Sequence, residues 1–294
     1  MNDDRKIIFF LNPKAGEGIV ENLEDEITRQ SDAAGYNCRM YEMTGEGDEA
    51  RMRDELESFR PSIAVACGGD GTVNLVAGLV MGKNIKMGIV PLGSANGMAY
   101  QMDIPVDPLE AVAQVFKGPP GKVDVIKVGK EKICLHLSDL GMNARVIRRF
   151  ESEKVRGFIG YAKQYFKELG NIKKFKTIIR SDNRQVSSGA IMVVAANSSY
   201  YGTGAIINPQ GKIDDGKFEI IVIKPFPFWF FFYLVVALFT GGLSSHRFIK
   251  VLQVEKATIR VSPAQELQVD GEVTGRKQIV DLEILPGKLE IIRG

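Results

Sequence analysis

The sequence predicts two domains of different architecture, an open α/β domain with a parallel sheet and then an antiparallel β-sandwich domain. Apolar strands alternate with amphipathic helices up to about residue 120, and short strands follow one another beyond Pro119-Pro120-Gly121. The 294 residues suffice for two cores, and a composition of 45% hydrophobic and 25% charged residues is typical of globular proteins. We therefore assign 1–121 to the first domain and 122–278 to the second, with 279–294 able to complete the first domain or to pack on the second.

The first domain is expected to contain four strands that run in the same direction. Each candidate strand is short and apolar, and a helix with apolar residues about one turn apart follows it. The strands are expected at 6–11, 36–43, 63–66 and 86–91, and the helices at 19–34, 48–59, 72–81 and from about 94. Because strands joined by helices run parallel, we expect a three-layer domain with helices on both faces of the sheet.

The second domain is expected to consist mainly of short strands with alternating apolar residues. These strands are expected at 122–128, 132–137, 177–180, 190–195, 218–223, 256–261 and 267–270, followed by 279–285 and 289–292. A basic and aromatic stretch at 158–168 is expected to form a helix among them. The pattern is typical of an antiparallel sandwich or barrel.

Charge is unevenly distributed along the chain, although the formal net charge is only +2. Residues 21–57 hold 12 acidic and 4 basic side chains, whereas residues 145–184 hold 12 basic and 4 acidic ones. The basic segment could attract an anionic membrane surface, and a solvated helix face would explain it equally well. We expect no nucleic-acid partner.

The cysteines and the N-terminus both predict a cytoplasmic protein. Cys38, Cys67 and Cys134 are odd in number, far apart and without a CxxC pair, so we expect neither disulfides nor a zinc site. The first residues lack the basic-then-apolar order of a signal peptide. The longest apolar run, 225–239, is shorter than the about 18 residues of a membrane span and contains Pro227. A buried helix or a lipid-facing element would explain this run.

Polar or glycine-rich loops follow the four expected parallel strands. They are Asn12-Pro13-Lys14-Ala15-Gly16, Thr44-Gly45, Gly68-Gly69-Asp70-Gly71-Thr72 and Leu92-Gly93-Ser94-Ala95-Asn96-Gly97. Each loop lies at the carboxyl end of its strand, which is where open α/β sheets bind ligands. We therefore expect the four loops to line one binding edge.

The loop from Gly68 to Thr72 has the composition of a phosphate cradle. Its glycines accept positive φ and have no Cβ, so several N–H groups can point at one anion, and the helix expected from Thr72 adds further donors. Asp70 is unsuited to contact phosphate, and a Mg²⁺ ion or a substrate hydroxyl suits it better. The alternative is a plain strand-to-helix turn with Asp70 as the N-cap.

The order of these motifs along the chain resembles that of the diacylglycerol kinase catalytic-domain family, which includes bacterial lipid kinases and the sphingosine and ceramide kinases. Neither GxxxxGK[ST] nor GxGxxG occurs in the sequence. Three segments resemble the nucleotide loops of that family: Asn12-Pro13-Lys14-Ala15-Gly16, Gly68-Gly69-Asp70-Gly71-Thr72-Val73-Asn74 and Pro91-Leu92-Gly93-Ser94-Ala95-Asn96. Asp214-Asp215-Gly216 and Val269-Asp270-Gly271-Glu272 resemble two later acidic motifs, so the likeness covers nearly the whole chain.

The resemblance implies a role for each matched residue. ATP would be held by Asn12, Pro13, Lys14, Ala15, Gly16, Thr44, Gly68, Gly69, Asp70, Gly71, Thr72, Val73, Asn74, Ser94 and Asn96. A structural Mg²⁺ would be held by the Asp215 side chain and the backbone carbonyls of Lys212 and Lys217. Glu272, or Asp270 beside it, would take the proton of the lipid hydroxyl, with Asp70 as the rival base.

The same resemblance implies an ATP-dependent lipid kinase with its site in the cleft between the two domains. Diacylglycerol or a related lipid would be the substrate, and the protein would be cytoplasmic and peripherally attached to an anionic membrane. A homodimer is left open. A sphingoid-base kinase, an NAD kinase and a nucleotide-binding or lipid-binding regulator without turnover remain alternatives.

Four places in the sequence depart from the family pattern. Gly97 stands where the family commonly has an acidic residue, Leu75 where it often has Glu, and Asn143 where it often has Asp. His136-Leu137-Ser138 replaces an Asn-bearing strand. Missing carboxylates would weaken the handling of Mg²⁺ or lipid more than the binding of nucleotide.

Overall fold

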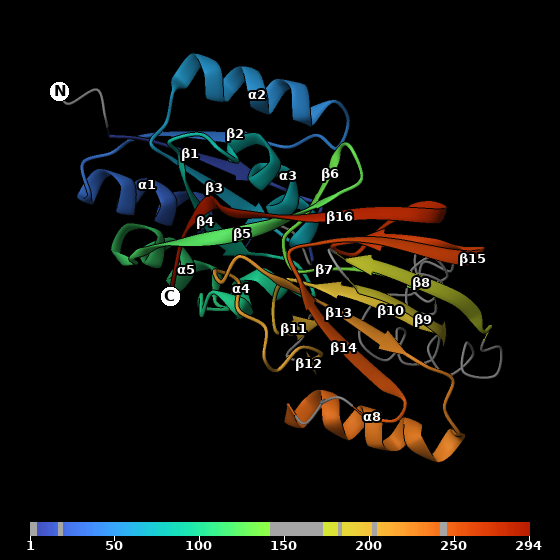
Figure 1. Cartoon of the computed structure of the whole chain (residues 1–294). Helices are drawn as coiled ribbons and strands as arrows, with labels where there is room; N and C mark the ends of the chain where they lie inside the picture. The colour runs from blue at the N-terminus through green and yellow to red at the C-terminus, as the bar shows by residue number, and fades with distance from the viewer. Residues whose placement is uncertain (1–4, 17–19, 142–172, 182–183, 202–204, 242–245) are drawn as a thin grey trace. The chain divides into compact units, whose positions relative to one another are not determined.

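The computed structural model describes residues 5–16, 20–141, 173–181, 184–201, 205–241 and 246–294 (Figure 1). The chain divides into two compact units, Met1–Val123 with Gly287–Gly294, and Asp124–Pro286. The helix expected at 158–168 and most of the basic segment 145–184 lie outside the described residues. None of the described helices combines the length and hydropathy needed to cross a bilayer.

The first unit is built on a parallel sheet, which confirms the predicted α/β class. β1 (Lys6–Leu11) pairs in parallel with β2 (Asn37–Glu42) and with β3 (Ile63–Gly68). β4 (Lys86–Pro91) pairs in parallel with β3. β3 is buried along its whole length and β1 along all but its first residue, as expected for central strands covered on both faces.

Helices cover this sheet in two layers (Figure 1). α1 (Leu23–Ala33) packs against α5 (Pro108–Lys117), and α2 (Asp48–Phe59) packs against α3 (Asp70–Val80). The short α4 (Gly97–Gln101) contacts α3 and β4. Because the helices alternate with the strands along the chain, every strand ends at the same edge of the sheet.

Four helices of the first unit differ from the prediction, and one of them is α4, which begins at Gly97 rather than near residue 94. α1 begins at Leu23 rather than residue 19, after Asn22 in a left-handed conformation with a φ of +65°. α3 begins at Asp70 rather than Thr72, because Gly69 has the extended backbone of an N-cap residue. α5 is not among the predicted helices, although Asp107 is a clear start signal whose Oδ1 accepts the N–H groups of Leu109 and Glu110.

The second unit is an antiparallel β-sandwich, which confirms the predicted class of the second domain. The strands are β5 (Pro120–Val128), β6 (Lys132–Cys134), β7 (Leu137–Gly141), β8 (Phe175–Ser181), β9 (Arg184–Ala190), β10 (Met192–Ala196), β11 (Tyr200–Tyr201), β12 (Ala205–Ile206), β13 (Phe218–Ile223), β14 (Ile249–Val254), β15 (Lys256–Val269) and β16 (Glu272–Ile292). The main run of paired strands is β14-β13-β10-β7-β15-β16. The end of β16 belongs to the first unit, where Ile291 pairs in parallel with Met87 of β4.

The middle strands of the second unit are buried on both faces. Along β13, Ile220 and Val222 point into one apolar cluster, whereas Ile221 and Ile223 point into another. α8 (Phe228–Thr240) covers the second cluster with its buried side chains. Most of the apolar run 225–239 therefore lies in a helix that packs on the sandwich, and Pro227 is its N-cap.

A buried carboxylate changes the strand pattern expected near residue 135. The prediction of one strand over 132–137 is wrong, because the chain leaves β6 after Cys134 and begins β7 at Leu137. Between these strands the N–H groups of Leu135, His136 and Leu137 all donate to the Asp270 carboxylate, at 2.6, 3.1 and 3.0 Å. The strands expected at 256–261 and 267–270 are instead one strand, β15, with a register shift between Arg260 and Gln265.

We expect Asp270→Asn to lower the free energy of unfolding by about 2 to 4 kcal/mol, because an amide cannot accept all of these buried donors. Asp281→Asn is the matched control, since Asp281 is exposed and its carboxylate accepts a hydrogen bond from Thr258 Oγ1 at 2.7 Å. The control should change stability by about 0.5 kcal/mol or less. Urea unfolding of both variants measures the difference, and equal effects would contradict the structural role of Asp270.

The same carboxylate should make stability depend on pH. Burial opposes ionisation, but the neighbouring His136 and the surrounding N–H groups hold the pKa of Asp270 at about 2, below its usual 3.8. A folded-state pKa below the unfolded value gives stabilisation that is complete above about pH 4 and is lost as the pH falls from 4 towards 2. Unfolding curves between pH 2 and pH 6 should show this loss for the parent protein, and Asp270→Asn should reduce it.

Candidate functional site

Hydrogen bonds join the loops that follow β1, β2 and β3 at the carboxyl edge of the parallel sheet. Asn12 Nδ2 of the first loop donates to Thr72 Oγ1 at the start of α3, at 2.9 Å. Lys14 Nζ donates to the carbonyl of Thr44 in the second loop, also at 2.9 Å. Asn12 Oδ1 accepts the N–H of Lys14 at 3.0 Å, which folds the first loop back on itself. Four residues predicted to hold ATP are thus brought together.

Glycines allow the third and fourth loops to touch through their backbones. A Cβ on Gly93 would lie 2.5 Å from Gly69 Cα, and a Cβ on Gly69 would lie 3.3 Å from Gly93 Cα. Gly16 has a φ of +55°, and a Cβ there would overlap the carbonyl oxygen of Leu92. Loop packing is therefore a second reason for glycine at these positions, beside the approach of phosphate that their composition predicts.

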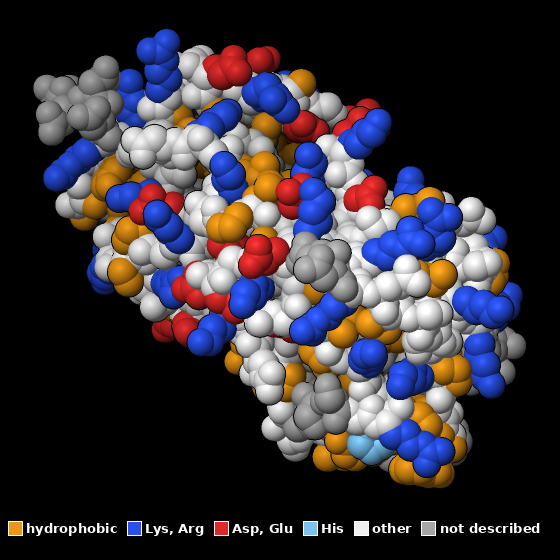
Figure 2. All heavy atoms as spheres, in the orientation of Figure 1, with side chains coloured by type: hydrophobic (Ala, Val, Ile, Leu, Met, Phe, Trp, Pro, Cys, Tyr) orange, Lys and Arg blue, Asp and Glu red, His pale blue; other side chains and the backbone are white. Residues whose placement is uncertain are grey.

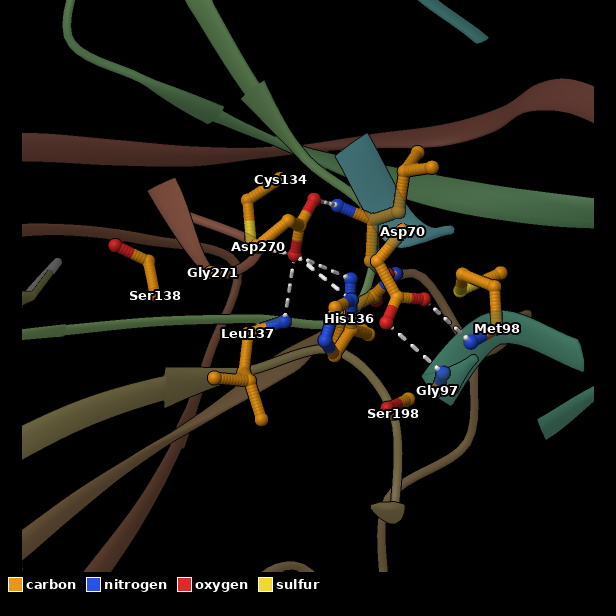
Figure 3. Close-up of polar contacts among 12 residues, drawn as sticks. Asp70, Gly97, Met98, Cys134, His136, Leu137, Ser138, Ser198, Asp270 and Gly271 are labelled. Atoms are coloured by element: carbon orange, nitrogen blue, oxygen red, sulfur yellow. Dashed lines mark hydrogen bonds and ion pairs between the residues drawn. The ribbon is translucent and has the colours of Figure 1, made fainter. Parts of the chain in front are cut away.

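Asp70 positions the fourth loop from the third. Its Oδ2 accepts the N–H of Gly97 at 3.1 Å and its Oδ1 accepts the N–H of Met98 at 3.3 Å (Figure 3). Gly69 rather than Asp70 is the N-cap of α3, so the alternative in which Asp70 caps its own helix is wrong. Both carboxylate oxygens of Asp70 are instead engaged at the start of α4, where negative charge is favourable.

The predicted ATP-binding residues lie on these loops and at the start of α3, and they differ in exposure. Exposed at this edge are Lys14, Gly16, Thr44, Gly71 and Ser94. Buried or half-buried are Asn12, Pro13, Ala15, Gly68, Gly69, Asp70, Thr72, Val73, Asn74 and Asn96. The side chain of Asn96 closes its own loop, since Nδ2 donates to the carbonyl of Gly93 at 2.7 Å and Oδ1 accepts the N–H of Gly93 at 2.9 Å. Val73 lies in the core, so both residues shape the loops from within.

Asp48 is a residue of this edge that the sequence reasoning missed. It is buried, and its carboxylate accepts the N–H groups of Thr44 and Gly45 at 3.1 and 2.7 Å and the hydroxyl of Tyr41 at 3.2 Å. Burial opposes ionisation, but these N–H groups hold the pKa of Asp48 below its usual value. The signal was an acidic residue at the start of α2, four residues after Thr44. Asp48 therefore fixes the loop that receives Lys14.

The two candidate bases of the late acidic motif differ sharply in their surroundings. Glu272 is exposed, and its Oε2 lies 3.8 Å from Lys132 Nζ. Asp270 is buried, and in addition to the three N–H groups its carboxylate accepts a hydrogen bond from Cys134 Sγ at 3.3 Å (Figure 3). The carboxylate also lies 3.0 Å from His136 Nδ1. A buried carboxylate with a pKa of about 2 binds protons weakly. Glu272 is therefore the better placed of the two to accept a proton.

The loop 212–217 offers oxygen atoms of the kind that Mg²⁺ prefers. Asp215 is exposed, and its Oδ1 accepts the N–H of Lys217 at 3.0 Å. The loop is held by Asp124, whose Oδ2 accepts the N–H of Gly216 at 2.6 Å and whose N–H donates to Ile213 at 2.7 Å. In the part of the chain that the structure describes, acidic and thiol or imidazole side chains form no group of three around a metal site. An ion here would therefore rely on backbone carbonyls as well as Asp215.

The described residues that depart from the family pattern lie in different surroundings. His136 lies at the Asp270 carboxylate, so the replacement of an Asn-bearing strand brings an imidazole to a buried acid. Gly97 contributes an N–H group to Asp70 in place of a carboxylate. Asn143 lies outside the described residues.

Two family models match this chain. Residues 6–128 match the model described as Diacylglycerol kinase catalytic domain, and residues 138–293 match the one described as YegS C-terminal NAD kinase beta sandwich-like domain. A diacylglycerol kinase of Staphylococcus haemolyticus is 25% identical over 273 residues, covering 90% of this chain and 81% of the relative. The protein of Chromohalobacter salexigens named Probable lipid kinase YegS-like is 26% identical over 245 residues, covering 81% and 78%.

Solved structures show the same fold. The crystal structure of a diacylglycerol kinase from Bacillus anthracis has a TM-score of 0.78 at 20% identity, covering 99% of this chain and 97% of the other. Another crystal structure from this organism has a TM-score of 0.82 at 23% identity with the same coverage. The second family model alone matches more than half of the chain, and the first matches the unit that contains the joined loops. The chain therefore belongs to the diacylglycerol kinase catalytic-domain family.

Proposed function

We propose that this protein is an ATP-dependent lipid kinase that transfers the γ-phosphate to a lipid hydroxyl, with diacylglycerol or a related lipid as its substrate. The joined loops at the carboxyl edge of the parallel sheet support the proposal, because hydrogen bonds and glycine contacts bring residues from four separate loops to one place. Membership of the diacylglycerol kinase family supports the use of ATP and of a lipid alcohol.

The residues of the loop edge would mainly position ATP and neutralise its charge. The N–H groups at the start of α3, where Gly71 is exposed, would bind phosphate, and Lys14 would provide positive charge beside it. Thr44 would orient the nucleotide from the second loop, which Asp48 holds in place. Mg²⁺, when bound, would neutralise phosphate charge at the reaction centre, and a structural Mg²⁺ at Asp215, Lys212 and Lys217 would stabilise the second unit.

We assign the general base to Glu272. Of the three candidate carboxylates, Asp70 is engaged by two N–H groups of α4, and Asp270 is buried with a pKa of about 2. Glu272 is exposed and can accept a proton from a lipid hydroxyl. The adjacent Gly271, with a φ of +91°, gives the turn before Glu272 a conformation that other residues rarely adopt.

An acceptor panel with labelled ATP tests the function as a whole. Transfer of label to diacylglycerol would support the proposal, and transfer only to a sphingoid base or to NAD would redirect it to another acceptor. Binding of ATP without transfer to any acceptor would contradict a kinase and indicate a regulator.

Gly71→Val should weaken ATP binding by at least about ten-fold, because a branched side chain would cover N–H groups that bind phosphate. Gly71 is exposed in the first turn of α3, where valine is tolerated by the helical backbone. Gly78→Val makes the same change at an exposed position two turns further along this helix and is the matched control. Calorimetric titration with ATP measures both affinities. Normal affinity in Gly71→Val would exclude this loop from the site.

Glu272→Gln should reduce turnover by about 10²-fold to 10⁴-fold, the usual effect of losing a general base, and leave ATP affinity almost unchanged. Glu283→Gln is the matched control, since Glu283 also lies on β16 and pairs with a lysine, Lys256, at 3.4 Å. Initial rates with a dispersed diacylglycerol distinguish the two variants. Near-normal rates in Glu272→Gln would assign the late acidic motif a structural role and make Asp70 the leading base.

A further inference from the structure

α8 presents a stripe of large apolar side chains to solvent. Trp229 and Val236 are 63% and 60% exposed, more than any other large hydrophobic residue that the structure describes. Tyr233, which lies between them, is 40% exposed. The spacing of four and then three residues places these side chains on one face of the helix. Exposed apolar residues grouped in this way indicate an interaction surface.

The helix is held firmly beneath this stripe. Phe230, Leu234 and Ala237, each one residue beyond a member of the stripe, are buried against the sandwich. The ring of Phe248 lies 4.8 Å from that of Phe230 and 6.4 Å from that of Trp229, measured between centroids. The stripe is therefore the outer surface of an anchored helix.

Basic groups border the stripe. Lys224 Nζ donates to the carbonyl of Arg247 at 3.2 Å, and the Arg247 guanidinium lies 5.0 Å from the centroid of Phe248. From residue 220 to residue 254 the sequence contains no Asp or Glu. Lys174 lines an open pocket of about 340 Å³ together with Pro225, Phe226 and Pro227 at the start of the helix.

Figure 2 shows this combination of surface groups. In the part of the surface where Figure 1 places α8, hydrophobic side chains lie next to Lys and Arg side chains. The surface therefore pairs an apolar centre with a border of positive charge.

We propose that the outer stripe of α8, bordered by Lys174, Lys224 and Arg247, docks on the surface of an anionic bilayer. Trp and Tyr favour the interface between lipid headgroups and acyl chains, and basic side chains are attracted to anionic headgroups. A symmetric dimer through the same surface would bring two basic borders together, which is unfavourable. The proposal rests on the proposed function, since a lipid kinase meets its substrate in a membrane.

Trp229 gives a direct test because it is the only tryptophan of the chain. Vesicles of phosphatidylcholine and phosphatidylglycerol should shift its emission to shorter wavelengths, and brominated acyl chains should quench it. Vesicles of phosphatidylcholine alone should have much less effect. An unchanged spectrum with vesicles that nevertheless sediment the protein would overturn the proposal, because another surface would then be docking.

Variants separate the apolar stripe from the basic border. Tyr233→Ala with Val236→Ala should weaken sedimentation with the anionic vesicles, whereas Val106→Ala with Ile279→Ala should not. The control residues are 55% and 46% exposed, so the comparison removes apolar surface of similar exposure elsewhere. Lys224→Gln and Arg247→Gln should each weaken binding about five-fold, the equivalent of about 1 kcal/mol per basic group. Equal effects of stripe and control variants would overturn the proposal, and so would a concentration-dependent dimer that the stripe variants abolish.

Activity on a short-chain diacylglycerol dispersed without vesicles distinguishes failure of docking from failure of the function. Stripe variants should keep this activity and lose activity on vesicles that contain long-chain diacylglycerol. Bilayer docking through Trp229 without any lipid phosphorylation would contradict the proposed function and leave the docking surface standing. If the stripe variants phosphorylate lipid in vesicles as well as the parent protein does, the docking proposal would be contradicted and the proposed function would stand.

Discussion

Parallel pairing of β1 with its neighbours β2 and β3, and of β3 with β4, is the constraint on which the candidate site depends. A parallel sheet delivers the ends of all its strands to one edge, so four loops distant in sequence must share a small space. The loops pack closely where Gly69 contacts Gly93 and where Gly16 contacts Leu92, and only glycine leaves room there because a Cβ on Gly93 or Gly16 would overlap the neighbouring backbone. The glycine content of these loops and the place of the expected phosphate site thus both follow from the parallel pairing of the strands.

The acidic side chains of this fold differ in burial, and buried ones have a different role from exposed ones. Asp48 and Asp270 are buried, and each uses its charge to collect backbone N–H groups that would otherwise lack partners. Both carboxylates therefore fix the chain, one in the loop that follows β2 and the other two residues before Glu272. Glu272 itself is exposed, and its carboxylate is the base that we propose.

In the second unit, apolar residues of a single helix likewise differ in burial. β13 is buried on both faces, so the sandwich needs an additional cover, and α8 provides it with Phe230, Leu234 and Ala237. The stripe of Trp229, Tyr233 and Val236 is exposed on the same helix, and it is the surface for which we propose docking on lipid. One run of apolar sequence thereby serves both stability and the proposed docking.

The sequence by itself determined the two fold classes and the place of the four loops, because strand period, helix period and glycine composition are local signals. It could not determine which carboxylate is buried. Asp270 and Glu272 are two residues apart and chemically alike, yet N–H groups more than 130 positions away surround Asp270, whereas Glu272 is exposed. Likewise, periodicity could not tell which face of α8 is covered, since nearly all of its residues are apolar. Tertiary structure decided both points, because burial depends on contacts between segments that are far apart in the chain.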